Sequence, residues 1–122
     1  MKFVKLIVVA AIILGSQLSF AGWQNNTTVT ITSSSFYGSL RASRDSANNT
    51  EYLACYVNGQ TDAITCFARD ASSNYKSCTI AAPDDGDYAT VSAVSSSTYL
   101  YVAFSGGTCT RVQATNGSYN LP

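Results

Sequence analysis

The chain has 122 residues, of which 11% are charged, and its seven basic residues balance its seven acidic ones. It contains no histidine, which removes the usual general base, a common zinc ligand and the central member of serine and cysteine catalytic triads. Because the charges are scattered and form no basic stripe, we expect no nucleic-acid partner.

The first residues predict an export signal. Two lysines precede an uncharged apolar run over 6–14, which is too short to span a bilayer but long enough for the core of a signal peptide. Small residues then form a cleavage site before Gly22. We therefore expect a cleavable signal over 1–21, one domain over 22–122, a secreted or periplasmic location and no membrane insertion after cleavage. An uncleaved membrane anchor is the less favoured alternative.

The remaining sequence favours strands and turns, because it is rich in Ser, Thr, Tyr and Val and has no long stretch with a helical apolar period. Short strands separated by polar turns predict an all-β domain, an antiparallel β-sandwich or a small barrel of about seven or eight strands. The expected strands are 27–33, 36–43, 51–57, 63–69, 75–80, 88–94, 98–104 and 108–115.

Three of these strands alternate clearly between apolar and polar residues, so each has one face that we expect to pack into the core. The core-facing rows are Leu53, Cys55 and Val57; Ile64, Cys66 and Ala68; and Leu100, Val102 and Phe104.

The cysteines predict two structural disulfides. Their number is even in a small exported domain, and none forms the short Cys-x₂₋₄-Cys pair of most structural zinc sites. A tight turn over 70–74 places Cys66 opposite Cys78, whereas a wider loop over 58–63 places Cys55 opposite Cys66, so all three connectivities stay open once Cys109 is included.

Acidic residues are the remaining candidates for catalysis or metal binding. A glycosidase needs two carboxylates across a sugar bond, but no spacing singles out a pair, and most acids fall in expected turns. The segment over 84–87 holds three aspartates around a glycine, and a solvated turn is favoured over a calcium site. We expect no catalytic residue, no metal and no cofactor. The acids considered are Asp45, Glu51, Asp62, Asp70, Asp84, Asp85 and Asp87.

Tyrosine supplies the candidate binding site. Tyr52 and Tyr56 alternate with one core-facing row, and Tyr99 and Tyr101 alternate with another, so these four side chains are expected to face outward. Such a surface suits stacking on sugar rings or anchoring of a protein partner. The alternative is that tyrosines cover a sheet surface that they favour in any case.

Several segments resemble small exported bacterial proteins that contain cysteines, have an all-β fold and are of unknown function. The segments are 38–46, Tyr52-Leu53-Ala54-Cys55, 66–70, Ser77-Cys78 and the late Cys109. The resemblance implies a bacterial periplasmic or secreted setting and carries over no activity and no site.

These observations together favour an exported, non-enzymatic binding module that recognises a carbohydrate or a surface protein through its tyrosines. One alternative is a structural subunit whose strands pair edge to edge into an extracellular filament or matrix. A small inhibitor of an exported enzyme is another.

Overall fold

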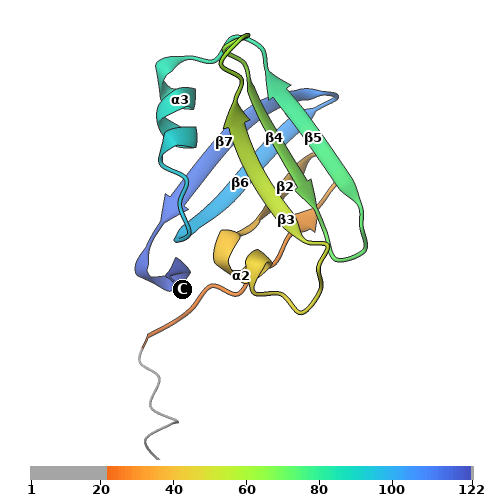
Figure 1. Ribbon diagram of the computed structural model, residues 1–122, viewed down its shortest axis with the longest axis vertical. Coiled ribbons are helices and arrows are strands. Elements are labelled where there is room, and N and C mark those ends of the chain that lie inside the picture. Colours follow the sequence, from red (N-terminus) through yellow and green to blue (C-terminus); the bar gives the residue numbers. More distant parts are fainter. Residues whose placement is uncertain (1–21, 122) are drawn as a thin grey trace, which may run out of the picture.

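The computed structural model describes residues 22–121, and the expected export signal lies outside the described residues. Over these residues the fold is mostly β, with seven strands in one sheet and two short helices (Figure 1). Neither described helix has the length and apolar character needed to cross a membrane. The elements are β1 (Thr30–Ile31), β2 (Ser35–Ser39), α2 (Leu40–Arg44), β3 (Tyr52–Val57), β4 (Ile64–Arg69), β5 (Tyr75–Ile80), α3 (Asp85–Ser92), β6 (Thr98–Ser105), β7 (Thr108–Asn116) and the 3₁₀ turn η1 (Ser118–Asn120).

The strands follow the order β1-β2-β6-β7-β5-β4-β3. All neighbours are antiparallel except β5 and β7, which run parallel where Thr79 pairs with Thr108. The prediction of a purely antiparallel sheet is therefore wrong at this junction. After β5 the chain forms α3 and then the β6–β7 hairpin. In this hairpin β7, and not β6, lies beside β5, and it runs in the same direction as β5. The sheet is not closed, since β1 and β3 end the order without pairing.

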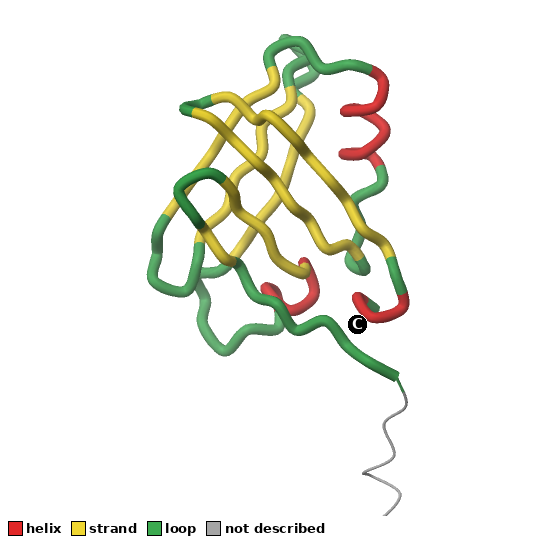
Figure 2. The backbone as a smooth tube through the Cα atoms, turned by 180° about the vertical axis from the view of Figure 1, so that it is seen from behind, coloured by secondary structure: helices red, strands yellow, loops and turns green. Residues whose placement is uncertain are grey.

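The sheet is bent into two facing parts. Strands β3, β4 and β5 cross in front of β6 and β2 in Figure 1, and Figure 2 shows the same arrangement from behind. Side chains of both parts meet in one core, as predicted for two of the three rows: Ile64, Cys66 and Ala68 from β4, and Leu100, Val102 and Phe104 from β6. The third row is only partly right, because Leu53 is buried but Val57 is 42% exposed where β3 reaches the rim.

Both expected disulfides form, and both expected cysteine registers occur together. Cys55 lies opposite Cys66, which lies opposite Cys78, so the three form one row across β3, β4 and β5. The bonds join Cys55 to Cys66 and Cys78 to Cys109. The second bond crosses from β5 to β7, at the junction where the two parts of the sheet meet.

The prediction of a strand over 88–94 is wrong, because the helix α3 occupies this region. Its first turn is held by a reciprocal capping box: the Asp87 N–H donates to Asp84 Oδ1 at 2.8 Å, and the Asp84 N–H donates to Asp87 Oδ2 at 3.0 Å. Tyr88 and Val91 of α3, three positions apart, are partly buried against the core, as is Val94 just after the helix. The segment expected to be a solvated turn is thus the start of a helix.

The strand expected over 36–43 ends early, because the chain turns into α2 after Ser39. The buried Ser39 side chain accepts a hydrogen bond from the Ala42 N–H at 3.2 Å, and the Ser43 hydroxyl donates to the Ser39 carbonyl at 2.8 Å. A serine cap followed by Leu, Arg and Ala favours a helical turn over a strand. Consequently α2 lies near one end of the bent sheet, close to β2, β3 and β6.

Candidate functional site

The outer surface of β3, β4 and β5 carries an aromatic patch. The register places Tyr52 opposite Arg69, and Arg69 opposite Tyr75, in one row across the three strands. Two further aromatic side chains share this side of the sheet, since the alternate residues of β4 are buried in the core. We call the following five residues the aromatic face: Tyr52, Tyr56, Phe67, Arg69 and Tyr75.

The three tyrosines of the aromatic face are unusually exposed for large rings. Tyr52 is 39% exposed, Tyr56 49% and Tyr75 50%. Phe67 supports two of them from the middle strand, with ring centroids 5.8 Å from Tyr52 in an edge-on arrangement and 6.1 Å from Tyr56. Packing against Phe67 limits the motion of the rings, so the apolar surfaces stay available to a ligand at a low entropic cost.

Arg69 is the only charged residue on the outer side of β3, β4 and β5, given the strand register. Its Nε is buried and has no hydrogen-bond partner among the described residues. Within residues 22–121 the one ion pair joins Arg41 to Asp45, so no carboxylate neutralises Arg69. A guanidinium between two tyrosines therefore offers donors to a ligand that lies across the rings.

The other two predicted tyrosines lie in a different group, on the outer side of β2 and β6. The Tyr37 ring stacks on Tyr101 at 5.9 Å and lies 6.2 Å from Tyr99. We call these three residues the tyrosine ladder. Each ring is partly covered, and burial, followed by the proximity of the other two phenols, raises the pKa of Tyr99 above its ordinary value. The ladder thus covers the sheet surface more than it projects from it.

The structure brings Tyr52 together with Tyr56, and Tyr99 together with Tyr101, but it does not unite the two pairs. Strands β7, β5 and β4 separate β6 from β3 in the sheet order. Because the inner sides of β4 and β6 share one core, their outer sides point in opposite directions. The four tyrosines form two surfaces rather than one.

Phe67, Arg69 and Tyr75 are residues of the aromatic face that were not among the predicted site residues. The signal for them lay in the two hairpin registers considered for the cysteines. If both registers hold at once, position 69 lies opposite both 52 and 75. The alternation around Cys66 further turns Phe67 outward. The two registers are compatible, because β4 pairs with β3 along one edge and with β5 along the other.

Comparison of the chain with protein-family models, with curated proteins and with solved structures finds no match.

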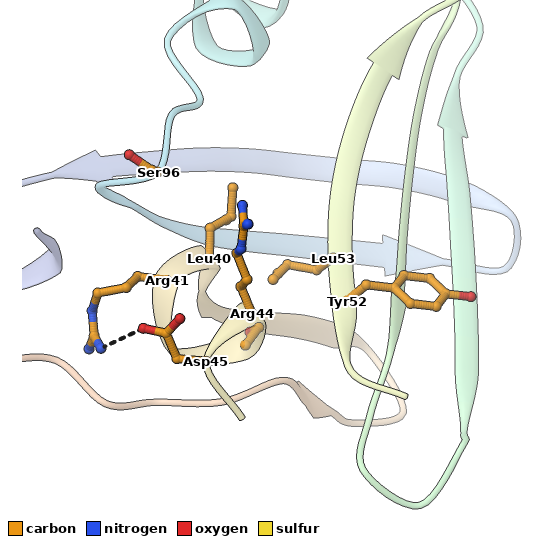
Figure 3. Close-up of a pocket in the computed structure, with 8 residues that line it drawn as sticks. Leu40, Arg41, Arg44, Asp45, Tyr52, Leu53 and Ser96 are labelled. Atoms are coloured by element: carbon orange, nitrogen blue, oxygen red, sulfur yellow. Dashed lines mark ion pairs between the residues drawn. The ribbon is translucent and has the colours of Figure 1, made fainter. Parts of the chain in front are cut away.

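A pocket of about 440 Å³ lies beside the aromatic face, where α2 approaches β3 (Figure 3). Its volume is in the usual range for small-molecule sites. Apolar side chains of α2 and β3 contribute to its wall, and Ser96 of the turn before β6 lines another part of it. The lining residues are Leu40, Arg41, Ser43, Arg44, Asp45, Tyr52, Leu53 and Ser96.

The two arginines of this pocket differ in their partners. Arg41 is anchored: its Nη2 donates to the Asn25 carbonyl at 2.7 Å and to Asn26 Oδ1 at 2.8 Å, and its Nη1 lies 3.7 Å from Asp45 Oδ2. Arg44 has no ion-pair partner among residues 22–121. Figure 3 shows Arg41 extended toward Asp45, while Arg44 stands next to Leu40 on the side that faces Leu53.

Most of the acidic residues considered as catalytic candidates hold the backbone in place. Glu51 accepts from the Val29 N–H at 3.1 Å through one oxygen and from Asn48 Nδ2 at 2.8 Å through the other. The Asn74 side-chain amide donates to Asp70 at 3.0 Å and, as the largest cause, lowers the pKa of that carboxyl. The described residues contain no group of three or more His, Cys, Asp or Glu placed to hold a metal ion.

Proposed function

We propose that this protein is an exported, non-enzymatic module that binds carbohydrate through the aromatic face. The observation that carries the proposal is the grouping of three exposed tyrosines around one guanidinium with no acidic neighbour on the same surface. Two disulfides are compatible with an extracellular or otherwise oxidising environment.

The chemistry of sugars suits this combination of groups. A sugar ring presents C–H groups on its flat faces and hydroxyls at its edge, so it stacks on an aromatic ring while it accepts hydrogen bonds at its rim. The tyrosines supply the stacking surface and Arg69 supplies donors. Thr65 and Thr79 add hydroxyls that lie 3.1 Å apart near Tyr56.

The dimensions favour an extended ligand. Tyr52 and Tyr75 lie on strands that are two positions apart in the sheet, a separation of about 10 Å. Tyr52 and Tyr56 are four residues apart along β3, a separation of about 13 Å. These distances exceed one sugar ring, so we propose a polysaccharide chain rather than a single sugar as the ligand.

Retardation of the mature protein in native gels that contain soluble polysaccharides tests the proposal. The double variant Tyr56→Ala with Tyr75→Ala removes two exposed rings without opening the core. We expect it to weaken binding by about 10- to 100-fold, since each stacked ring contributes about 1 kcal/mol. The matched control is Tyr99→Ala with Tyr101→Ala, which removes two rings of the tyrosine ladder and should leave retardation unchanged.

Two results would reject the proposal. Loss of binding in the control variant but not in Tyr56→Ala with Tyr75→Ala would move the site to the tyrosine ladder. Absence of binding to every polysaccharide and to a glycan array would exclude carbohydrate and leave a surface protein as the ligand of the aromatic face.

A further inference from the structure

We propose that the pocket between α2 and β3 is a second binding site, which takes a small amphipathic anion with its acidic group on Arg44. This inference goes beyond carbohydrate binding by the aromatic face and depends on different residues. Tyr52 is the one residue that belongs to both surfaces.

The pocket has an apolar wall and a polar rim. Leu53 is 6% exposed and Leu40 is partly buried, so their side chains form the inner part of the wall. Ser96 and Arg44 are exposed and lie toward solvent. A ligand that fills about 440 Å³ therefore places an apolar body against the two leucines and a polar group at the rim.

The charge of that polar group follows from the ion pairs. Three charged residues line the pocket, and the Asp45 carboxylate is already paired with Arg41 at 3.7 Å. The Arg44 guanidinium keeps an unneutralised positive charge among the described residues. A carboxylate, sulfonate or sulfate fits the planar donors of this group, whereas a cation is repelled.

Position supports the same assignment. Arg44 ends α2, a helix that is fixed at its start by the buried Ser39 cap. Figure 3 shows the Arg44 side chain beside Leu40, with Leu53 projecting from the adjacent strand toward the same space. The cation thus lies next to the apolar wall, and one small molecule can contact both.

Two dyes that share an apolar skeleton test the charge requirement. The probe 8-anilinonaphthalene-1-sulfonate carries a sulfonate, and N-phenyl-1-naphthylamine lacks it. We expect fluorescence titration of the folded protein to give tighter binding of the sulfonate. Arg44→Gln should lower the affinity for the sulfonate dye by about fivefold or more and change the affinity for the neutral dye by less than about twofold. Arg44→Lys should restore part of the affinity, because it keeps the charge.

Controls separate this site from the rest of the surface. Arg111→Gln removes an exposed arginine of β7, outside the pocket, and should leave both titrations unchanged. Tyr56→Ala with Tyr75→Ala should also leave them unchanged, even if it abolishes polysaccharide binding. Amide chemical shifts recorded with the sulfonate dye should move at Leu40, Arg44 and Ser96.

Three outcomes would overturn the inference. The first is no binding of the sulfonate dye at millimolar concentration, and the second is an equal loss of affinity for this dye in Arg44→Gln and Arg111→Gln. The third is that the dye shifts amide signals of the aromatic face alone. Because each variant is compared by thermal unfolding as well, a loss caused by misfolding is recognised. In that case the wild-type protein is titrated with both dyes while its amide shifts are followed. The residues whose amides shift then show whether the dye binds in the pocket or on the outer sheet.

Discussion

Individual tyrosines of this protein differ in solvent exposure, and burial changes the pKa of the phenol. The Tyr75 ring is half exposed on the aromatic face, whereas Tyr99 is partly buried beside Tyr37 and Tyr101. Tyr75 lies on the outer side of β5 and Tyr99 on the outer side of β6, so both rings point away from the core. Alternation predicts on which face of the sheet a side chain lies, but its burial on that face depends on side chains from a neighbouring strand, such as Tyr37 beside Tyr99.

The raised pKa of Tyr99 predicts a loss of stability at alkaline pH. Below pH 10, the ordinary pKa, the phenol is neutral in both the folded and the unfolded chain. Above this pH the unfolded chain releases its proton first, so the free energy of unfolding falls until the pH passes the raised folded pKa. Tyr99→Phe should reduce this fall. Urea unfolding at about pH 8 and about pH 11 gives the free energy of unfolding at each pH. If Tyr99→Phe left the difference between these two free energies unchanged, the loss of stability would not come from Tyr99.

At the scale of elements, α3 shows where a strand pattern and a helix pattern compete. The segment over 88–94 has apolar residues at spacings that fit both periods. The aspartates before it decide the outcome, because Asp84 and Asp87 satisfy the first free N–H groups of a helix. The same reasoning applies to α2, where the Ser39 cap ends a strand that alternation alone would continue.

The Asp84 cap should contribute measurably to stability. Asp84→Ala removes the acceptor for the Asp87 N–H and frees the first turn of α3, and caps of this kind are worth about 1 kcal/mol. We expect urea unfolding to show a decrease of about that size, with helical circular dichroism reduced. Asp85→Ala changes an exposed acid in the same turn that makes no cap, so it should cost less. Equal costs for the two variants would show that local charge, and not the cap, stabilises the helix.

At the scale of the whole molecule, the two parts of the sheet are joined by little backbone pairing. Between β5 and β7 the ladder is a single parallel register pair, and the Thr79 N–H donates to the Gly107 carbonyl at 2.9 Å. The Cys78–Cys109 bond crosses this junction, whereas Cys55–Cys66 joins strands that already form a full hairpin. The Cys78–Cys109 bond therefore fixes the position of one part of the sheet relative to the other, and the Cys55–Cys66 bond reinforces one part.

The two disulfides should differ in their contribution to stability. Cys78 and Cys109 close a loop with a sequence separation of 31, and Cys55 and Cys66 one with a separation of 11, which corresponds to about 4 and about 3 kcal/mol from chain entropy. Cys78→Ala with Cys109→Ala should thus lower the free energy of unfolding more than Cys55→Ala with Cys66→Ala. Urea unfolding of the two double variants measures the difference. A larger cost for the hairpin bond would refute this view of the junction.

The amino-acid sequence was enough to predict the β-rich class, most strand positions, two of the core rows and the presence of two disulfides. These properties follow from alternation, turn residues and an even cysteine count, which act over a few neighbouring positions. The expected export signal lies outside the described residues and stays a prediction.

Which side chains share a surface depends on the packing of the folded chain. The bend of the sheet turned Tyr52 and Tyr56 away from Tyr99 and Tyr101, and the combined registers of two hairpins placed Arg69 between Tyr52 and Tyr75. The pocket at Arg44 required α2 to pack next to β3. These contacts join residues far apart in the chain, and their formation depends on how the two parts of the sheet share one core, which no local pattern encodes.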